Sequence, residues 1–217
     1  MKKETKKTDK SERNKSVFRE YTESIIIAVL LALLIRAFVI QAFKIPSGSM
    51  KPTLQVGDHI LVNKFIYGIK FRVPFTAINK TLLPISSPKR NDVVVFIFPV
   101  DPSKDFIKRV IGLPGDTVEI KDKKVYINNR PLDDPHGTYT DQRIIPAEEQ
   151  PRDNFGPRII PPGKFFVMGD NRDESYDSRF WLFVDRSQIL GKAFIIYWSW
   201  DRAEFGVRWS RLGNLIR

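Results

Sequence analysis

Three short segments contain residue types that could activate a nucleophile. The first, residues 45–54, reads IPSGSMKPTL and places Ser47 and Ser49 on either side of a glycine, between two prolines. Proline fixes φ and glycine tolerates unusual backbone angles, so such a segment can hold a serine in one rigid, exposed pose. The same composition is also typical of a linker. The segment is therefore a candidate nucleophile loop that needs a base from elsewhere in the chain.

The other two segments offer charged groups. Residues 105–116 read DFIKRVIGLPGD, with Lys108 inside an apolar, strand-like pattern that ends in a turn. A lysine in a strand most often points to water, and that interpretation holds for Lys108 taken alone. Residues 168–181 read MGDNRDESYDSRFW and gather acids, arginines and hydroxyls in one loop. We expect internal Asp–Arg pairs there, with Arg172 and Arg179 as donors.

Histidine chemistry is disfavoured by the positions of the two histidines, His59 and His136. A Ser-His-Asp triad needs a histidine that a carboxylate holds. His59 follows Asp58 in an apparent strand, where adjacent side chains point to opposite faces. His136 lies in a polar segment. Neither histidine is placed as a catalytic base.

Metal binding is also disfavoured. A calcium loop of the EF-hand type needs acids at alternate positions, a glycine at the sixth and a glutamate at the twelfth. Counted from Asp170, those two positions are Ser175 and Trp181. The chain has no cysteine, which excludes disulfides, thiol nucleophiles and Cys-ligated zinc. We expect no metal and no cofactor.

A serine–lysine pair remains, and it is physically coherent. A serine hydroxyl is a weak nucleophile until a base removes its proton. A lysine amine has an ordinary pKa of about 10.4, whereas useful general bases have a pKa of about 7 to 8. Lowering the pKa that far disfavours the charged amine by roughly 4 kcal/mol, which burial in an apolar pocket can supply. Phe106, Ile107 and Val110 offer such surroundings to Lys108.

The N-terminal part of the chain is typical of a membrane anchor. Residues 1–23 are polar, with eight Lys or Arg against five Asp or Glu, and residues 24–43 read SIIIAVLLALLIRAFVIQAF. Twenty helical residues span roughly 30 Å, the thickness of a bilayer core, and Arg36 near the end could extend to the interface. We predict a cytoplasmic tail (1–23), a transmembrane helix (24–43) and an extracytoplasmic domain (44–217). A cleaved signal peptide is a weaker alternative, because Ile40-Gln41-Ala42 is a poor cleavage site, and a buried soluble helix of this hydrophobicity is the weakest alternative.

The remainder of the chain is typical of a mainly β domain, either a barrel or a folded sheet. Short runs rich in Val, Ile, Phe and Tyr are bounded by turn residues. We predict an irregular stretch at 67–91 and a polar, proline-rich surface excursion at 133–162. The predicted strands are 59–67, 92–99, 106–112, 117–120, 124–127, 164–168 and 191–200.

Bulk composition limits the classes of function. The 217 residues are 42% apolar, which is enough for a core and argues against wholesale disorder. The net charge of +11 is spread along the whole chain. No nucleic-acid-binding module is recognisable, so we expect no nucleic-acid partner.

Together, the three segments resemble the bacterial type I signal peptidases, also called leader peptidases. These are membrane-bound serine proteases that remove signal peptides from exported preproteins. The resemblance runs from about Phe43 to Trp181 and is weaker in the C-terminal strands. It rests on three motifs in this order after an N-terminal anchor, which are very specific in combination: PSGSMKPTL (46–54), KRVIGLPGD (108–116) and GDNRDESYDSR (169–179).

The resemblance implies a role for each matched residue. Ser49 would be the nucleophile and Lys108 the general base. The hydroxyl of Ser47, with the amide of Ser49, would form the oxyanion hole, and Ser175 would orient the lysine amine. A charged network would brace the site: Asp170, Asp177 and Arg179.

The resemblance also implies the substrate and the location. Signal peptides of exported preproteins would bind as an added β-strand, with small residues of the Ala-X-Ala type before the cut. The protein would be a single-pass protein of the bacterial plasma or thylakoid membrane, in contact with the lipid bilayer. The residues implied to line shallow apolar substrate pockets are Phe43, Ile45, Met50, Leu54, Val95, Phe106 and Ile107.

Two positions depart from the family pattern, and two alternatives remain open. Tyrosine is common where Phe106 stands, and a small residue is common where Tyr176 stands; both differences would shape the pockets. Self-cleaving repressors of the LexA kind share the serine–lysine chemistry but carry a DNA-binding domain and no anchor. A membrane-tethered β domain that binds envelope partners without catalysis is the second alternative.

Overall fold

The computed structural model describes residues 19–32, 40–72, 79–83 and 85–217. The chain divides into two compact units, Met1–Val39 and Ile40–Arg217, and each is described by itself. In the first unit residues 19–32 are helical, with an exposed Arg19–Glu23 ion pair of 2.8 Å one turn apart. Within the described ranges, no helix combines the length and the hydrophobicity needed to cross a membrane.

The predicted transmembrane helix meets the structure only at its two ends. Residues 33–39 of that span, like residues 1–18 of the predicted tail, lie outside the described residues. At its C-terminal end the prediction was wrong, because Ile40–Lys44 form strand β1. β1 pairs with β2 (Asp58–Asn63) along its whole length, from Ile40 opposite Asn63 to Lys44 opposite His59. Pairing with a neighbouring strand, which the local hydrophobic run does not reveal, decides the conformation here.

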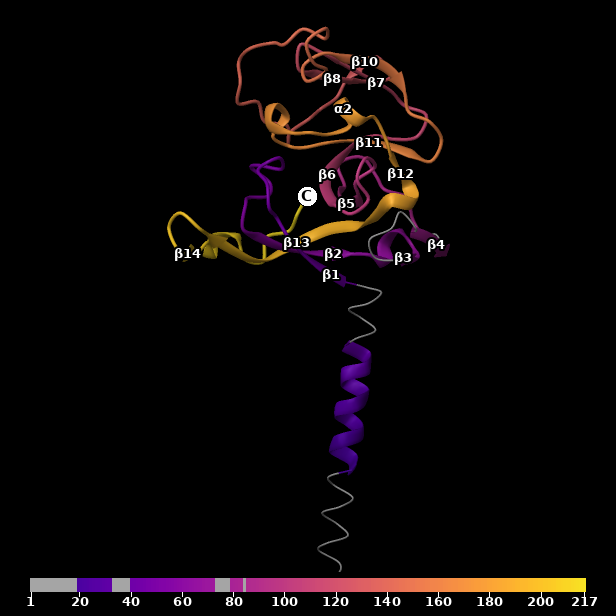
Figure 1. Ribbon diagram of the computed structural model, residues 1–217, viewed down its shortest axis with the longest axis vertical. Coiled ribbons are helices and arrows are strands. Elements are labelled where there is room, and N and C mark those ends of the chain that lie inside the picture. Colours follow the sequence, from indigo (N-terminus) through magenta and orange to yellow (C-terminus); the bar gives the residue numbers. More distant parts are fainter. Residues whose placement is uncertain (1–18, 33–39, 73–78, 84) are drawn as a thin grey trace, which may run out of the picture. The chain divides into compact units, whose positions relative to one another are not determined.

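The second unit is built on an eight-stranded antiparallel sheet in the order β1-β2-β13-β5-β6-β11-β12, with β14 paired to β13. Figure 1 shows β1, β2 and β13 crossing below β5 and β6, with β7, β8 and β10 at the opposite end of this unit. β13 is long and pairs with β2, β5 and β14, with register shifts that bend the sheet. The remaining bounds are β5 (Val93–Ile97), β6 (Asp105–Gly112), β11 (Lys164–Met168), β12 (Val184–Asp185), β13 (Ile189–Asp201) and β14 (Gly206–Val207).

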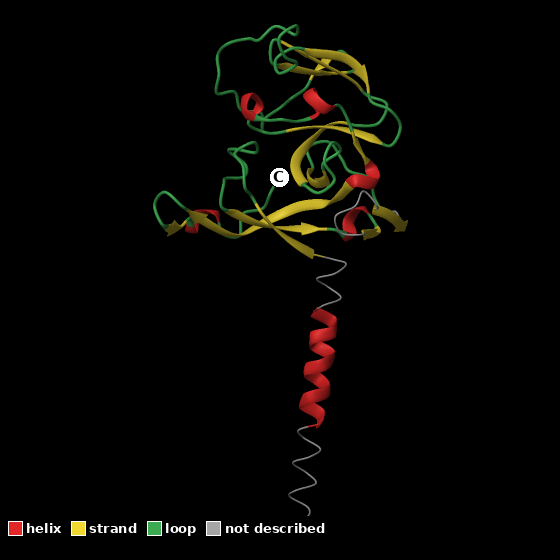
Figure 2. Cartoon of the chain, in the orientation of Figure 1, coloured by secondary structure: helices red, strands yellow, loops and turns green. Residues whose placement is uncertain are grey.

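Two smaller sheets are also present among the described residues of this unit. One has the order β10-β7-β8-β9 and the other is the β3-β4 hairpin. The helices of this unit are single short turns, and most of the rest is strand and loop (Figure 2). The bounds are β3 (Ile69–Arg72), β4 (Asn79–Leu83), β7 (Thr117–Lys121), β8 (Lys124–Ile127), β9 (Arg130–Pro131), β10 (Phe155–Ile159), η1 (Phe65–Tyr67), η2 (Arg172–Glu174), α2 (Ser178–Trp181), η3 (Arg186–Gln188) and η4 (Trp209–Arg211).

The mainly β prediction is confirmed, and each predicted strand has a counterpart. The strand predicted for residues 59–67 ends earlier, at Asn63, and a 3-10 turn, η1, follows. The side chain of Asn63 accepts a hydrogen bond of 3.0 Å from the amide of Ile66. Such a bond from an asparagine to the backbone ahead of it favours a turn over continued strand.

Strands occur both in the stretch predicted to be irregular and in the predicted surface excursion. The stretch 67–91 includes β3 and β4, and the excursion 133–162 includes β10, which pairs with β7. β10 contains Gly156 and Pro157, residues that normally argue against a strand, and the register shifts across them. A bulge at a sheet edge is where a strand tolerates glycine and proline, so the pairing survives.

Apolar side chains of the described part of the second unit form three core clusters. The first includes Ile45, Met50 and Leu54 from the nucleophile loop, each at most 2% exposed, packed with residues of β2, β5 and β13. The second gathers around Phe96 and Phe165, and the third lies among β7, β8 and β11. The apolar residues around Ser49 are therefore fixed in the core, which limits the positions open to the serine.

Candidate active site

Ser49 and Lys108 meet although they are 59 residues apart in the chain. The Nζ of Lys108 lies 2.7 Å from the Oγ of Ser49, within hydrogen-bond distance. The amine also donates to the carbonyl of Ile107 at 3.1 Å. Ser49 is 8% exposed and Lys108 is 4% exposed. The sheet brings them together, because β6 presents Lys108 toward the loop that follows β1.

The environment of Lys108 favours its neutral form. Burial lowers the pKa of the Lys108 amine to about 8; the nearby carboxylates of Asp177 and Asp170 oppose this shift and the guanidinium of Arg179 adds to it. The amine also lies 5.5 Å from the centre of the Phe106 ring. Removal of water from a charged amine disfavours the charge, so at slightly alkaline pH much of the amine is neutral. A neutral amine beside a hydroxyl can act as its base.

Backbone hydrogen bonds hold the nucleophile loop closed. The amide of Lys51 donates to Gly48 at 3.0 Å, and the amide of Leu54 donates to Met50 at 2.8 Å. At the base of the loop, Ile45 donates to the carbonyl of Asp58 at 2.9 Å. The carbonyl of Ser49 itself accepts from the amide of Asn171 at 3.1 Å. These bonds and the buried apolar side chains leave the serine little freedom.

Ser47 lies next to the nucleophile candidate. Its side chain is exposed, and its Oγ is 3.5 Å from the Oγ of Ser49. A hydroxyl at this position can donate to an oxyanion that forms on a carbonyl attacked by Ser49. Ser47 therefore has the reach that the predicted oxyanion role requires.

The loop at 169–179 packs against the nucleophile loop through a glycine. A Cβ built on Gly169 would lie 2.3 Å from both the Oγ of Ser175 and the carbonyl oxygen of Ser49. Any larger residue would push the two loops apart. The Oγ of Ser175 accepts from the amide of Gly169 at 3.2 Å and also hydrogen-bonds Asp177. The predicted bond from Ser175 to the lysine is not among the hydrogen bonds of these described residues, and the orienting role stays a prediction.

The charged residues of this loop form a buried network. Asp177 pairs with Arg179 at 2.9 Å, as the prediction of internal pairs requires. Arg172 instead reaches out of the loop to Asp134 and also donates to the carbonyl of Gly169 at 3.0 Å. Burial raises the pKa of Asp177, but the adjacent Arg179 and two further hydrogen bonds outweigh it and hold the pKa below its usual value. These groups are therefore charged supports for the loop.

Two members of the network were not singled out from the sequence. Arg109 donates to both carboxylate oxygens of Asp170 at 2.7 Å, and both side chains are fully buried. Thr53 adds a third hydrogen bond to Asp170 at 2.6 Å. In the sequence, the one indication of a separate role for Arg109 is its place directly after Lys108 in a predicted strand. Its side chain must then point to the opposite face, away from the serine. What it contacts there depends on the tertiary fold.

The predicted substrate-contacting residues are mostly gathered in one place. Six of the seven belong to or pack against the first core cluster; four are at most 2% exposed, while Phe43 and Ile107 are half-buried. Phe106 is separate, because it points to the other face of β6 and packs against the second cluster. The six are Phe43, Ile45, Met50, Leu54, Val95 and Ile107.

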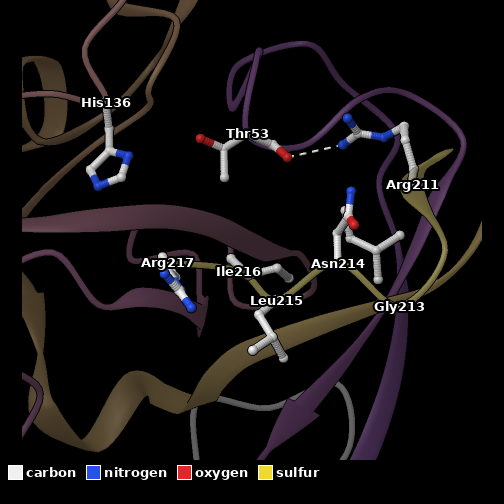
Figure 3. A pocket seen from close by; sticks show the side chains of 9 residues that line it. Thr53, His136, Arg211, Gly213, Asn214, Leu215, Ile216 and Arg217 are labelled. Atoms are coloured by element: carbon white, nitrogen blue, oxygen red, sulfur yellow. Dashed lines mark hydrogen bonds between the residues drawn. The ribbon is translucent and has the colours of Figure 1, made fainter.

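A pocket of about 550 Å³ lies away from the serine–lysine pair. Its lining includes Thr53, His136 and Arg211, but neither Ser49 nor Lys108. Figure 3 shows Arg211 donating to the carbonyl of Thr53, a bond of 2.9 Å, with His136 across the pocket. Burial is the main reason why the pKa of His136 is lowered, and the nearby guanidinium of Arg109 adds to the shift. The pocket is lined by the C-terminal segment together with Thr53 and His136, and it is not the site of the pair.

Comparisons with known proteins identify the family of the chain. Residues 18–198 match the family described as "Signal peptidase, peptidase S26". The chain is 41% identical to signal peptidase I of Pseudomonas aeruginosa, over 91% of this chain and 77% of that protein. It is 35% identical to signal peptidase I of Bacillus licheniformis, over 89% of this chain and 95% of that protein. A solved signal peptidase I from Enterococcus faecalis aligns with a TM-score of 0.40 and 29% identity, over 49% of this chain and 97% of that one.

The family match defines an enzyme of the hydrolase class, a protease. More narrowly, the chain belongs to the signal peptidase family, peptidase S26. The resemblance drawn from the three motifs is confirmed at this level.

Proposed function

We propose that the protein is a membrane-anchored serine endopeptidase that removes signal peptides from exported preproteins, with Ser49 as nucleophile and Lys108 as general base. The observation that carries the proposal is the 2.7 Å distance between the Lys108 amine and the Ser49 hydroxyl in a buried setting. The lowered pKa of Lys108 supports the assignment of the amine as the base. Membership in the signal peptidase family supports the choice of substrate.

The first half of the reaction uses the amine twice. Neutral Lys108 takes the proton of Ser49 as the Oγ attacks the scissile carbonyl, which yields a tetrahedral intermediate. The hydroxyl of Ser47 and the amide of Ser49 donate to its oxyanion, an interaction whose loss typically costs 10²–10³ in rate. The protonated amine then gives its proton to the leaving nitrogen, and an acyl-enzyme remains. In the second half, Lys108 deprotonates a water as the water oxygen attacks the acyl carbonyl. The protonated amine then returns this proton to the Oγ of Ser49 as the ester bond breaks, which releases the cleaved signal peptide and restores Ser49.

Substrate binding is supported by the edge of β6. Among the described strands, β11 pairs with β6 only from Arg109 to Gly112, so residues 106–108 lie beyond its end. An extended peptide could pair along this edge, next to the serine. Alternate residues of that peptide would face the cluster that contains Ile107. Because most of that cluster is already filled by buried side chains, we propose small residues, of the Ala-X-Ala type, at the first and third positions before the cut.

We further propose that residues 24–39 anchor the protein in the plasma or thylakoid membrane, with the N-terminus in the cytoplasm and the β unit outside. The sequence supports this through the apolar run and the lysine-rich tail before it. The nucleophile follows the apolar run closely in sequence. A cleavage site that emerges from a bilayer would then meet the enzyme near the surface.

The test is cleavage of a preprotein by the purified full-length protein in detergent. Ser49→Ala and Lys108→Ala should each leave no measurable cleavage, while circular dichroism and thermal unfolding show an intact fold. Matched controls come from an exposed turn: Ser103→Ala and Lys104→Ala, whose residues pair with Asp101, should cleave at the wild-type rate.

Other outcomes would point elsewhere. Retention of cleavage by Lys108→Ala would exclude the amine as the base. Cleavage of the chain itself, with no cleavage of the preprotein, would favour the self-cleaving alternative. An inert wild-type protein would favour a binding domain.

A further inference from the structure

An aromatic group lies on the face of β6 that carries Lys108. The rings of Phe98 and Phe106 are stacked, with centroids 4.2 Å apart and an interplanar angle of 5°. Tyr176 meets Phe98 edge-on at 6.2 Å and tilts against Phe180 at 5.2 Å. Trp181 backs the group, 5.8 Å from Phe98. We call Phe98, Phe106, Tyr176, Phe180 and Trp181 the aromatic shelf.

The shelf is next to the catalytic pair and open to solvent. The Lys108 amine is 5.5 Å from the Phe106 ring, and Tyr176 directly follows Ser175 in the loop at 169–179. Phe98 is only 7% exposed, but Tyr176 is 52% exposed. Nothing in the proposed proton transfers uses these rings. An exposed tyrosine on an aromatic base that extends through Phe98 and Phe106 to the Lys108 amine is therefore available to a bound substrate.

The geometry of strand addition assigns the shelf to one substrate position. Successive side chains of a strand point to opposite faces of a sheet. Ile107 faces the first core cluster, and Phe106 faces the shelf side. A peptide paired along residues 106–108, with its first and third residues before the cut toward the Ile107 cluster, turns its second residue toward the shelf.

We propose that the aromatic shelf is the binding surface for the second residue before the scissile bond and makes the enzyme prefer an aromatic or large apolar side chain there. This inference rests on the proposed function. Aromatic pairs contribute beyond simple burial, by an amount equivalent to about threefold to tenfold in kcat/KM. Because the shelf is open on the Tyr176 side, small residues at this position are cleaved too, at lower efficiency.

The experiment uses the full-length enzyme and peptides that carry Ala-Ala-Ala, Ala-Leu-Ala or Ala-Phe-Ala before one cut. The wild type should cleave the Phe peptide about threefold to tenfold more efficiently than the Ala peptide, measured as kcat/KM. Tyr176→Ala should bring this ratio close to one. Phe98→Leu, which keeps an apolar group in the buried position, should lower the ratio while thermal unfolding shows a folded protein. Tyr197→Ala, which changes an exposed tyrosine outside the shelf, should leave the ratio unchanged.

The possible failures are distinguishable. A wild-type ratio near one, or a ratio that Tyr176→Ala does not change, overturns the shelf assignment while the proposed function stands. A parallel series with Phe placed directly after the cut checks the position; a preference there, and none before the cut, also overturns the assignment. Absence of cleavage of every peptide, or cleavage by Ser49→Ala, defeats the proposed function and the inference with it.

Discussion

The Lys108 amine shows how the pKa of one residue depends on its burial. In water an amine is protonated at neutral pH and has no lone pair to accept a proton. Here burial lowers its pKa to about 8, against the attraction of the Asp177 and Asp170 carboxylates. Full burial without those acids would lower it further, at a greater cost to stability. The site balances a usable base against a charged network that holds the loops in place.

The pH dependence of cleavage follows from this pKa. The ordinary value near 10.5 is lowered to about 8, so the amine is mostly protonated below pH 8 and mostly neutral above it. We expect kcat/KM to rise with pH, by about tenfold per unit well below pH 8, and to level off above it. The measurement is kcat/KM between pH 5 and pH 10 on a peptide without titratable groups. Far-UV circular dichroism at each pH checks that the fold persists, and a flat profile down to pH 5 would argue against a neutral amine.

Residue types made the site partly predictable. Two serines around a glycine and a lysine in an apolar pattern pointed to a serine–lysine pair, and the structure brings Ser49 and Lys108 within hydrogen-bond distance. Arg109 and Thr53 were missed because arginine and threonine have many ordinary roles. Only their bonds to Asp170 reveal them as supports.

At the scale of elements, the C-terminal segment braces the nucleophile loop. Arg211, the last residue of η4, donates to Asp58 at 3.0 and 2.6 Å and to the carbonyl of Thr53 at 2.9 Å. Ser199 of β13 donates to the same carboxylate at 2.6 Å. Burial raises the pKa of Asp58, but Arg211 and the other donors outweigh it and hold the pKa below its usual value. Three segments distant in sequence thus converge on the base of the loop.

Because Arg211 makes these bonds, we expect the Arg211→Met variant to be less stable than the wild type. The change leaves the fully buried Asp58 carboxylate without its cation, and we expect the free energy of unfolding to fall by about 3 kcal/mol. Urea unfolding measures it, with Arg202→Met at an exposed position as a control that should change little. In the double variant with Asp58→Asn the loss should be smaller than the sum of the two single losses. Additive losses would mean that the pair does not act as a unit.

The elements themselves were predictable where the pattern was strong and local. Continuous apolar runs such as β5, with Val93–Ile97 buried throughout, were recognised directly. β10 was missed because its Gly156 and Pro157 argue against a strand, and only pairing with β7 supports it. β1 was predicted as helix because its residues continue an apolar run, and only β2 decides otherwise. In each case the missed information lies in a partner strand.

At the scale of the whole molecule, the two units have different compositions. Residues 24–39 form an almost unbroken apolar run, whereas Ile40–Arg217 has its own buried core. Under the proposed function, the first unit would supply membrane attachment and the second unit the chemistry.

Removal of residues 1–39 should therefore release the protein from membranes. We expect the full chain to sediment with phospholipid vesicles and the shortened chain to remain largely in the supernatant, because the apolar run supplies the burial in lipid. Both forms should show the same thermal unfolding of the β unit. If the shortened chain sediments as completely as the full chain, residues 24–39 are not the anchor and the β unit binds the bilayer by itself.

The sequence by itself determined the mainly β class, the three motifs and the choice of a serine and a lysine, because these follow from residue types, local order and short periodicities. Only the tertiary structure decided that Arg109 meets Asp170, that Arg211 meets Asp58, and that Phe98, Phe106 and Tyr176 form one surface beside Lys108. These contacts depend on strand register, and a slip of one residue would turn every side chain of a strand to the other face. Register is set by pairing between segments far apart in the chain, which no local pattern reports.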